Sequence, residues 1–392
     1  MHAMMKKLIA VLLFQSLTVA LLAQVSFGTP RLLNEGWRFL RVDSARNVVE
    51  NPEMKNPDYD DSRWRSVILP HDWGVEQPMS PEKGSCQGYL PGGIGWYRQR
   101  FNLQSSGVGL PAKLYVYFEG VYNHSEVYLN GRLLGRRPSG FASFLYDLTP
   151  YIHKEGDNVL AVRVDHSQEF DSRWYTGSGI NRNVWLISAP EVHLAPWGTA
   201  YRLKSISAKK AVIEVDVETT ADASPREKAF TAVVTLTDAE GKTVATTSTK
   251  ISAQEKKTVN LTVGNPQRWT LDRPYLYTLT TILLSKEAPS GAVGEAMTVG
   301  DALDLSEVRA GLRTLDFSPT KGFALNGEWM KVKGVCLHDD AGVLGTAVPP
   351  EVWRRRLLEL KRIGVNAIRM SHNPHAPALY DLCDELGLLV MD

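Results

Sequence analysis

Short apolar runs separated by polar stretches follow one another between Trp37 and Trp197, and no long helical pattern interrupts them. An Asn130-Gly131 pair between two of these runs is the signal of a two-residue hairpin turn. Strands at this spacing predict a β-sandwich. The clearest runs cover residues 114–118, 125–129, 132–134 and 159–164.

The pattern changes between about residue 201 and residue 313. Apolar and polar positions alternate in residues 212–217 and 231–236, and residues 238–241 supply a turn after the second run. This alternation predicts a smaller, immunoglobulin-like sandwich. Residues 286–300 are rich in Ala, Gly and Ser and are predicted to form a loop.

A third pattern begins near residue 331, where strand-like and helical segments alternate. Residues 331–336 form a strand-like run, and Trp353, Leu357 and Leu360 then recur at helical spacing ahead of Gly364. A second unit follows, in which Gly387 caps the helix. Its strand covers residues 366–370, its loop 371–374, its helix 377–386, and a third strand 388–392.

This repeat predicts parallel βαβ units, as in a (β/α)8 barrel or a doubly wound open sheet. Each strand is followed by a titratable side chain: His338 after the first, His372 after the second, and Asp392 at the third. Because the carboxyl ends of parallel strands share one edge, these side chains are candidates for a functional site.

Several stretches, taken together and in order, resemble glycoside hydrolase family 2, which includes β-galactosidases, β-glucuronidases and β-mannosidases. The resemblance covers most of the chain. The matching stretches are residues 69–73 (LPHDW), 95–98 (GWYR), 118–121 (FEGV), 177–180 (GSGI), 334–340 (GVCLHDD), 366–374 (NAIRMSHNP) and 382–392 (LCDELGLLVMD).

The resemblance implies a multidomain β plus α/β protein. Residues 24–199 are expected to form a jelly-roll sugar-binding domain, 200–313 the immunoglobulin-like sandwich, which acts as a spacer, and 314–392 the first part of a TIM barrel. A retaining glycosidase needs two carboxyl groups about 5 to 5.5 Å apart. In this family they are glutamates at the ends of the fourth and seventh strands, and the sequence ends before the fourth. We therefore assign no catalytic residue here, and neither Glu385 nor Asp392 takes that role.

Four residues are candidates for holding the sugar. His338 and His372 match histidines that bind sugar hydroxyls, and a neutral imidazole can donate from one nitrogen and accept at the other. The alternative is that each is a rim histidine satisfied by a backbone carbonyl. Arg369 would point into the barrel toward a carboxylate, or form a buried ion pair. Asp171 matches an aspartate that a jelly-roll loop extends to the barrel mouth, or it simply caps a turn.

Neighbouring residues bear on the substrate. Asp339 and Asp340 form an acidic rim that favours a neutral galactoside over a glucuronide, whose carboxylate would meet like charges. Ten tryptophans are present, and most are expected in the sandwich core rather than in sugar-stacking platforms. The examples are Trp37, Trp64, Trp73 and Trp96.

The charge composition and the number of cysteines narrow the partners and the kind of fold that we expect. Forty-four basic and 43 acidic residues give a formal net charge of +1 without a basic stripe, which argues against nucleic acid as a partner. Three cysteines are too few for a disulfide framework.

Residues 1–23 combine Lys6-Lys7, an apolar run and Ala23, which predicts a cleaved signal peptide and export to the periplasm or medium, with an uncleaved anchor as the alternative.

The sequence thus predicts the amino-terminal portion of a secreted, retaining exo-β-glycosidase most similar to a β-galactosidase, acting on a carbohydrate substrate. A β-glucuronidase or β-mannosidase of the same family and a non-catalytic carbohydrate-binding protein are alternatives. A metal-dependent barrel hydrolase using His338, Asp339, His372 and Asp392 is a further alternative, although the usual metal-binding spacings are missing. No cofactor is expected to be required, and the resemblance allows a Mg or Na ion in the complete enzyme.

Overall fold

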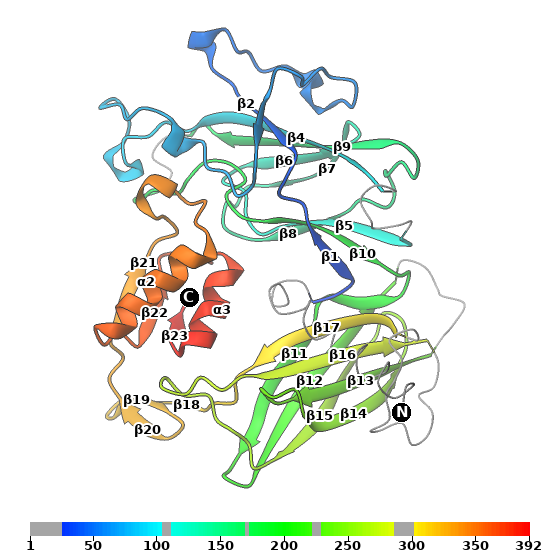
Figure 1. The fold of residues 1–392 in the computed structure, drawn as a ribbon, viewed down its shortest axis with the longest axis vertical. Helices are drawn as coiled ribbons and strands as arrows, with labels where there is room; N and C mark the ends of the chain where they lie inside the picture. The colour runs from blue at the N-terminus through cyan, green and yellow to red at the C-terminus, as the bar shows by residue number, and fades with distance from the viewer. Residues whose placement is uncertain (1–25, 104–110, 169–171, 222–228, 286–301) are drawn as a thin grey trace, which may run out of the picture. The chain divides into compact units, whose positions relative to one another are not determined.

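The computed structural model describes residues 26–103, 111–168, 172–221, 229–285 and 302–392 (Figure 1). The predicted signal peptide, Asp171 and the predicted loop 286–300 lie outside these residues. The chain divides into two compact units. One contains residues 192–317 and 324–328, and the other contains residues 29–191, 318–323 and 329–392.

The larger unit begins with a β-sandwich of two antiparallel sheets. The first sheet has the order β1 (Thr29–Leu32), β10 (Val184–Ala189), β5 (Lys113–Phe118) and β8 (Phe144–Asp147). The second has the order β3 (Arg65–Val67), β2 (Trp37–Arg41), β4 (Gly93–Asn102), β9 (Asp157–His166), β6 (Ser125–Leu129) and β7 (Arg132–Arg137). Asn130 and Gly131 both have positive φ in the turn between β6 and β7, as the predicted hairpin requires.

Aromatic side chains are buried on both faces of the six-stranded sheet. Trp37 and Trp73 are fully buried beside Tyr97 in the core between the sheets, whereas Trp64 and Trp96 are buried in a separate cluster. All four tryptophans are therefore buried, but only Trp37 and Trp73 belong to the sandwich core as predicted. Short 3-10 helices connect the strands: η1 (Ser44–Arg46), η2 (Pro52–Lys55), η3 (Gly74–Glu76) and η4 (Ser85–Gln87).

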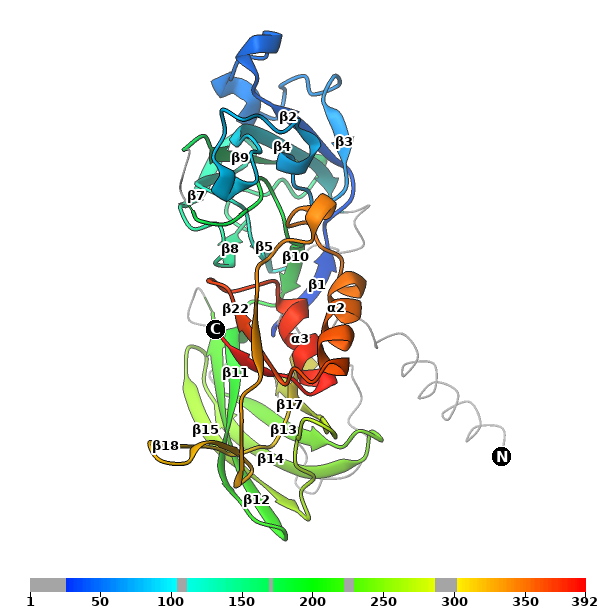
Figure 2. The same cartoon turned by 90° about the vertical axis from the view of Figure 1, so that its left-hand side faces the viewer.

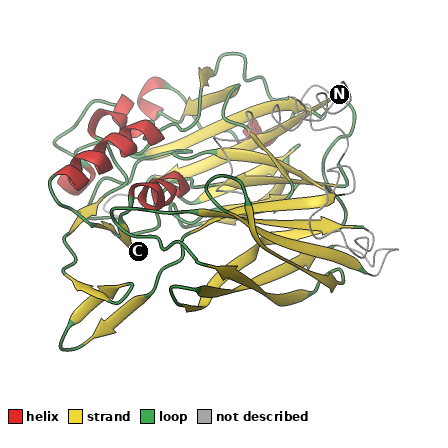
Figure 3. Ribbon diagram, turned by 60° about the horizontal axis from the view of Figure 1, so that its bottom comes forward, coloured by secondary structure: helices red, strands yellow, loops and turns green. Residues whose placement is uncertain are grey.

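The other unit is the immunoglobulin-like sandwich. One sheet has the order β11 (His193–Ile206), β12 (Lys210–Thr220) and β15 (Lys256–Gly264). The other has the order β14 (Thr243–Ile251), β13 (Phe230–Thr237), β16 (Tyr277–Leu284) and β17 (Ala302–Ala310). Burial alternates residue by residue along β12, because only one face of the strand meets the core. Figure 3 shows that strands predominate in the molecule and helices are few.

A small sheet of β18 (Leu315–Ser318), β19 (Gly322–Leu325) and β20 (Glu328–Met330) precedes the barrel segment. That segment contains β21 (Gly334–Leu337), η6 (Gly342–Leu344), α2 (Pro350–Arg362), β22 (Ala367–Met370), α3 (Pro377–Leu386) and β23 (Leu389–Met391). The three strands are parallel, in the order β21-β22-β23.

One face of this parallel sheet is covered by its own helices. Ile368 and Met370 pack with Trp353 and Leu357 of α2 and with Leu379 of α3, and Figure 2 shows both helices beside β22. Gly387 follows α3 in the left-handed conformation, with a φ of 72°. The predicted alternation of strands and helices is thus confirmed.

Candidate functional site

Three aromatic side chains meet where the barrel strands end. The ring centroid of Trp174 lies 5.6 Å from that of His338 and 5.1 Å from that of His372, and the two histidine rings are 5.6 Å apart. All three contacts are edge-to-face. His338 follows β21 directly, His372 follows β22, and Trp174 comes from the jelly-roll segment between β9 and β10. We call these three residues the histidine wall.

The ring nitrogens of the two histidines in the histidine wall are free of hydrogen bonds to other described residues. No hydrogen bond from the imidazole of His338 or His372 to another described residue is present, so neither is satisfied by a backbone carbonyl. His372 is exposed, and His338 and Trp174 are partly exposed. Such imidazoles can donate to and accept from a sugar hydroxyl, while the indole face offers apolar surface.

Asp339, next to His338, is used quite differently. It is 8% exposed, and its Oδ2 accepts hydrogen bonds from Arg182 Nη2 at 2.7 Å and Asn373 Nδ2 at 3.1 Å. His375 Nδ1 lies 3.3 Å from Oδ1. Asp339 is therefore paired and buried rather than part of an acidic rim, and the expectation that it would face the substrate as a free charge is wrong. Asp340 remains partly exposed.

Arg182 connects the jelly roll to the barrel segment. Besides Asp339, it donates to the carbonyl oxygens of Pro374 at 2.7 Å and Phe141 at 2.9 Å. A Cβ on Gly120 would lie 2.8 Å from Arg182 Cδ, so a larger residue there would displace the guanidinium. Because Asn373 and Pro374 follow His372, Arg182 fixes the loop that carries this histidine.

Glu119 lies beside this network and carries an unusual carboxyl group. Burial raises the pKa of Glu119 to about 7, against the lowering effect of hydrogen bonds from Trp185 and Asn183. Trp185 Nε1 donates to Glu119 Oε1 at 2.7 Å. The carboxyl group thus titrates near neutral pH inside the sandwich.

Asp72 joins three loops at a second buried point. Its Oδ1 accepts from the backbone N–H groups of Gly74 and Ser178, both at 2.9 Å. Its Oδ2 accepts from Tyr175 Oη at 2.8 Å and from the N–H of Thr346 at 3.0 Å. Thr346 belongs to the segment after β21, so this carboxylate ties the jelly roll to the barrel segment. We call Asp72 and Asp339 the carboxylate anchors.

Gly177 shows why the anchor at Asp72 needs small residues. It has a φ of +75°, and a Cβ there would lie 1.9 Å from Thr346 Oγ1. Only glycine combines this backbone conformation with so close an approach. The LPHDW and GSGI stretches seen in the sequence therefore meet each other and the barrel segment in space.

His375 is a site neighbour that the sequence reasoning missed. It is 2% exposed, and burial lowers its pKa despite the nearby Asp339 carboxylate. Its ring lies 6.4 Å from that of Trp353. Trp174, Arg182 and Asn373 were also missed, although each lies inside or beside a stretch that carried the family resemblance.

The remaining candidates lie at the edge of the site. Arg369 is exposed on β22 and contacts Cys336 Sγ at 3.7 Å, with no carboxylate partner among the described residues. Asp392 accepts from Tyr380 Oη at 2.6 Å. Glu385 pairs with Arg354 between α3 and α2, away from the strand ends. Asp171, the fourth sugar-holding candidate, has no described position.

The described parts of the chain contain neither a cluster of metal ligands nor a membrane-spanning helix. No three side chains from His, Cys, Asp and Glu come together there as a set of ligands, so we derive no step through a Mg or Na ion. No helix in those parts is long and apolar enough to cross a membrane.

Comparisons with curated proteins place this chain among bacterial glycosidases. It is 42% identical over 366 residues to beta-galactosidase BoGH2A of Bacteroides ovatus, covering 92% of this chain and 40% of the relative. It is 37% identical over 361 residues to a putative beta-glucuronidase of Formosa agariphila, covering 92% of this chain and 32% of that relative. The chain thus spans well under half the length of these relatives.

Solved structures give the same placement. A glycosyl hydrolase family 2 member from Bacteroides cellulosilyticus matches with a TM-score of 0.81 and 32% identity, over 93% of this chain and 45% of that one. A beta-glycosidase from Bacteroides vulgatus matches with a TM-score of 0.79 and 36% identity, over 93% and 44%.

Three family models match consecutive parts of the sequence. They are described as the sugar binding domain of glycosyl hydrolases family 2 at residues 29–190, glycosyl hydrolases family 2 at residues 192–292, and the TIM barrel domain of glycosyl hydrolases family 2 at residues 319–392. The chain therefore belongs to glycosyl hydrolases family 2.

Proposed function

We propose that this chain supplies the amino-terminal part of a retaining exo-β-glycosidase, most similar to a β-galactosidase. The observation that supports this best is the histidine wall. Its imidazoles carry no hydrogen bond within the described chain, and they lie at the strand ends where barrel enzymes perform their chemistry.

The chemistry assigned to this chain is substrate holding. A retaining mechanism uses one carboxylate as nucleophile and a second carboxyl group as acid and then base. In the proposal those groups come from later barrel strands. His338 and His372 bind hydroxyls of the terminal sugar, and Trp174 packs against its C–H surface. Asp171 and Arg369 remain proposed contacts at the mouth and inner face of the barrel.

The neutral galactoside is the preferred substrate of this proposal because the relative with 42% identity is a beta-galactosidase. Asp339 does not contribute to this preference, because Arg182 neutralises its carboxylate. A β-glucuronidase is the second candidate, because a relative with 37% identity is named a putative beta-glucuronidase. In addition, the buried, paired Asp339 carboxylate would not repel the carboxylate of a glucuronate.

Export is a further part of the proposal. Lys6-Lys7, the apolar run and Ala23 form the pattern of a cleaved signal peptide, with the mature chain starting at Gln24. Amino-terminal sequencing of protein recovered from the periplasm or medium tests it. An intact Met1 would argue for the anchor instead.

The substrate test uses an enzyme that joins this sequence to the rest of a barrel. Nitrophenyl β-galactoside, β-glucuronide and β-mannoside are compared by kcat/KM. We expect the galactoside to be preferred at least tenfold, since a mismatched hydroxyl leaves buried polar groups unpaired. A preference for the glucuronide overturns the galactoside assignment.

A second test uses the 392-residue chain alone. We expect no turnover of any of the three nitrophenyl glycosides above a control preparation, because no residue of this chain is assigned as nucleophile or acid. Turnover by the purified chain would show that its own carboxyl groups perform the reaction. It would then contradict the division of roles proposed above.

A further inference from the structure

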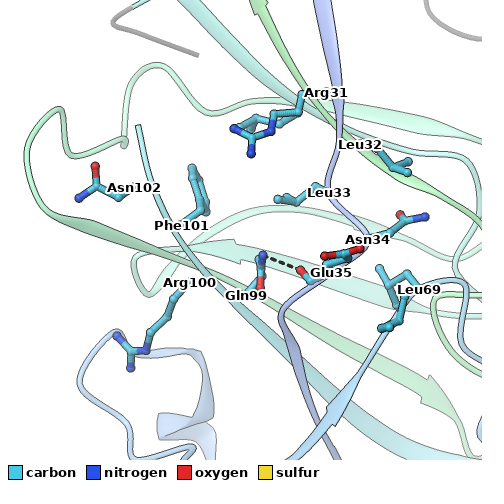
Figure 4. A pocket seen from close by; sticks show the side chains of 12 residues that line it. Arg31, Leu32, Leu33, Asn34, Glu35, Leu69, Gln99, Arg100, Phe101 and Asn102 are labelled. Carbon is cyan, nitrogen blue, oxygen red and sulfur yellow. Dashed lines mark hydrogen bonds between the residues drawn. The ribbon is translucent and has the colours of Figure 1, made fainter. Parts of the chain in front are cut away.

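A pocket of about 600 Å³ lies on the jelly roll, lined by residues of β1, of the segment that follows it, and of β4 (Figure 4). Its size is within the range of about 300 to 1,000 Å³ that is usual for small-molecule sites. It shares no lining residue with the histidine wall. Its polar lining includes Arg31, Glu35 and Gln99.

Gln99 presents an unused acceptor to this pocket. The side chain is 7% exposed, and its Nε2 donates to the carbonyl oxygen of Glu35 at 2.9 Å, which fixes the orientation of the amide. Its buried Oε1 has no hydrogen-bond partner. Buried polar atoms in native proteins are normally paired. A hydrogen-bond donor to this amide oxygen would therefore come from a bound molecule.

Gly36 keeps the space beside this acceptor open. Its φ is +78°, and a Cβ there would lie 3.2 Å from Gln99 Oε1 and 3.3 Å from Nε2. A side chain at this position would therefore press on the amide as well as strain the backbone. Glycine therefore leaves the amide undisturbed and keeps space open beside it.

Three charged side chains line the pocket, Arg31, Glu35 and Arg100, and Arg100 Nη2 donates to the carbonyl oxygen of Pro57 at 2.9 Å. Arg31 and Glu35 are exposed, and neither side chain makes a hydrogen bond or ion pair with a described residue. In Figure 4 the Arg31 side chain extends toward the side of the pocket where Phe101 lies, and Glu35 lies beside Gln99. Arg31 and Glu35 together offer donors and acceptors of opposite charge, which suits a polar ligand with several hydroxyl groups.

Apolar side chains complete the lining. Leu32 and Ile68 line the pocket and are 43% and 67% exposed, respectively. Leu69 and Phe101 are almost fully buried and form deeper apolar wall. A ligand with hydroxyl groups along its edges and C–H groups on its faces matches this combination of surfaces.

We propose that this pocket is a second carbohydrate site, which binds a neutral pyranose unit independently of the barrel. A ring hydroxyl donates to Gln99 Oε1, Arg31 donates to a second oxygen, Glu35 accepts from a third hydroxyl, and Leu32 and Ile68 cover a C–H face. The site would hold a carbohydrate on the jelly roll, and it does not depend on the proposed hydrolytic function.

The 392-residue chain itself provides the test. Binding of methyl β-D-galactopyranoside and β-1,4-galactobiose is measured by saturation-transfer NMR and by titration calorimetry. Variants Arg31→Ala and Gln99→Leu should each weaken binding about threefold to tenfold, the effect of one or two lost hydrogen bonds. Arg31→Ala removes only an exposed side chain, so it tests the site even if Gln99→Leu perturbs the fold.

Two further variants separate this site from others. Arg46→Ala, a matched exposed arginine of the jelly roll outside the pocket, should bind as the unchanged chain does. If His372→Ala removes all binding while Arg31→Ala and Gln99→Leu do not weaken it, the sugar occupies the histidine wall and the proposal is overturned. The absence of binding to both sugars would also overturn it. So would binding by Arg31→Ala and Gln99→Leu that is as tight as binding by the unchanged chain.

Discussion

The carboxylate anchors and the histidine wall come from neighbouring segments, yet their polar atoms are used in opposite ways. Asp72 and Asp339 are buried, and their carboxylate oxygens accept hydrogen bonds from donors within the protein. His338 is partly exposed and His372 is exposed, and their imidazoles make no hydrogen bond to another described residue. The difference separates residues that assemble the site from residues that remain available to a ligand.

The largest effect is expected for Arg182→Met. This change leaves the Asp339 carboxylate buried without its guanidinium, and breaking a buried ion pair on one side costs about 3 to 5 kcal/mol. Urea unfolding of the chain, followed by tryptophan fluorescence, measures the loss. The exposed Arg46→Met variant is the control, and an Arg182→Met midpoint equal to that control would show that the anchor contributes nothing.

A somewhat smaller loss is expected for Asp72→Asn. The amide keeps one acceptor oxygen but turns a donor toward the N–H of Thr346, so that buried donor loses its partner. An unsatisfied buried group costs about 1 to 3 kcal/mol. The same unfolding measurement applies, with Asp60→Asn on an exposed turn as the control. If Asp72→Asn and Asp60→Asn have the same urea midpoint of unfolding, Asp72 is not an anchor.

The pH dependence of stability should depend on Glu119. Its pKa is raised from 4.5 to about 7 by burial, so the folded state favours the neutral carboxyl group. The associated stability is complete below about pH 4.5 and is lost as the pH rises toward 7. Glu119→Gln should therefore match the unchanged chain at pH 4.5 and exceed it at pH 8, by about 3 kcal/mol in free energy of unfolding.

Unfolding curves of both proteins at the two pH values check this sign. Glu76 provides the contrast: its burial is outweighed by hydrogen bonds from His71 and Arg65, and its pKa is lowered to about 2. Its contribution is present above about pH 4.5 and is lost only as the pH falls toward 2. A Glu119→Gln advantage that grows toward acid pH would contradict the assignment of Glu119.

The smallest effect on stability is expected at the histidine wall. His372 is exposed and its imidazole is unbonded, so His372→Ala should change the free energy of unfolding by no more than about 0.5 kcal/mol. The unfolding measurement used for the anchors checks this directly. A loss as large as that of Arg182→Met would mean that the wall is structural.

The contrast between anchors and wall also explains how much the sequence could predict. The end of α3 at Leu386, its Gly387 cap and the turn at Asn130 follow from local patterns, and all are present. His338 and His372 could be selected because strand ends in a parallel repeat share an edge. Local spacing was sufficient in each of these cases.

The anchors could not be derived in this way. Arg182 and Asp339 are 157 positions apart, and their pairing depends on how a sandwich loop meets a strand end. Asp339 therefore looked like a free rim charge, because an adjacent Asp340 gave no sign that only one of the two is buried. Asp72 and Gly177 stood out as parts of motifs, but their shared contact with Thr346 becomes evident only in three dimensions.

The most direct test of the account concerns the histidine wall. In an enzyme that joins this sequence to the rest of a barrel, kcat/KM for nitrophenyl β-galactoside is measured for His338→Ala and His372→Ala, with the exposed jelly-roll variant His153→Ala as the control. The account predicts a loss of about tenfold or more for each wall variant, with unchanged thermal stability and an unaffected control. Values of kcat/KM equal to the control for both wall variants would contradict it.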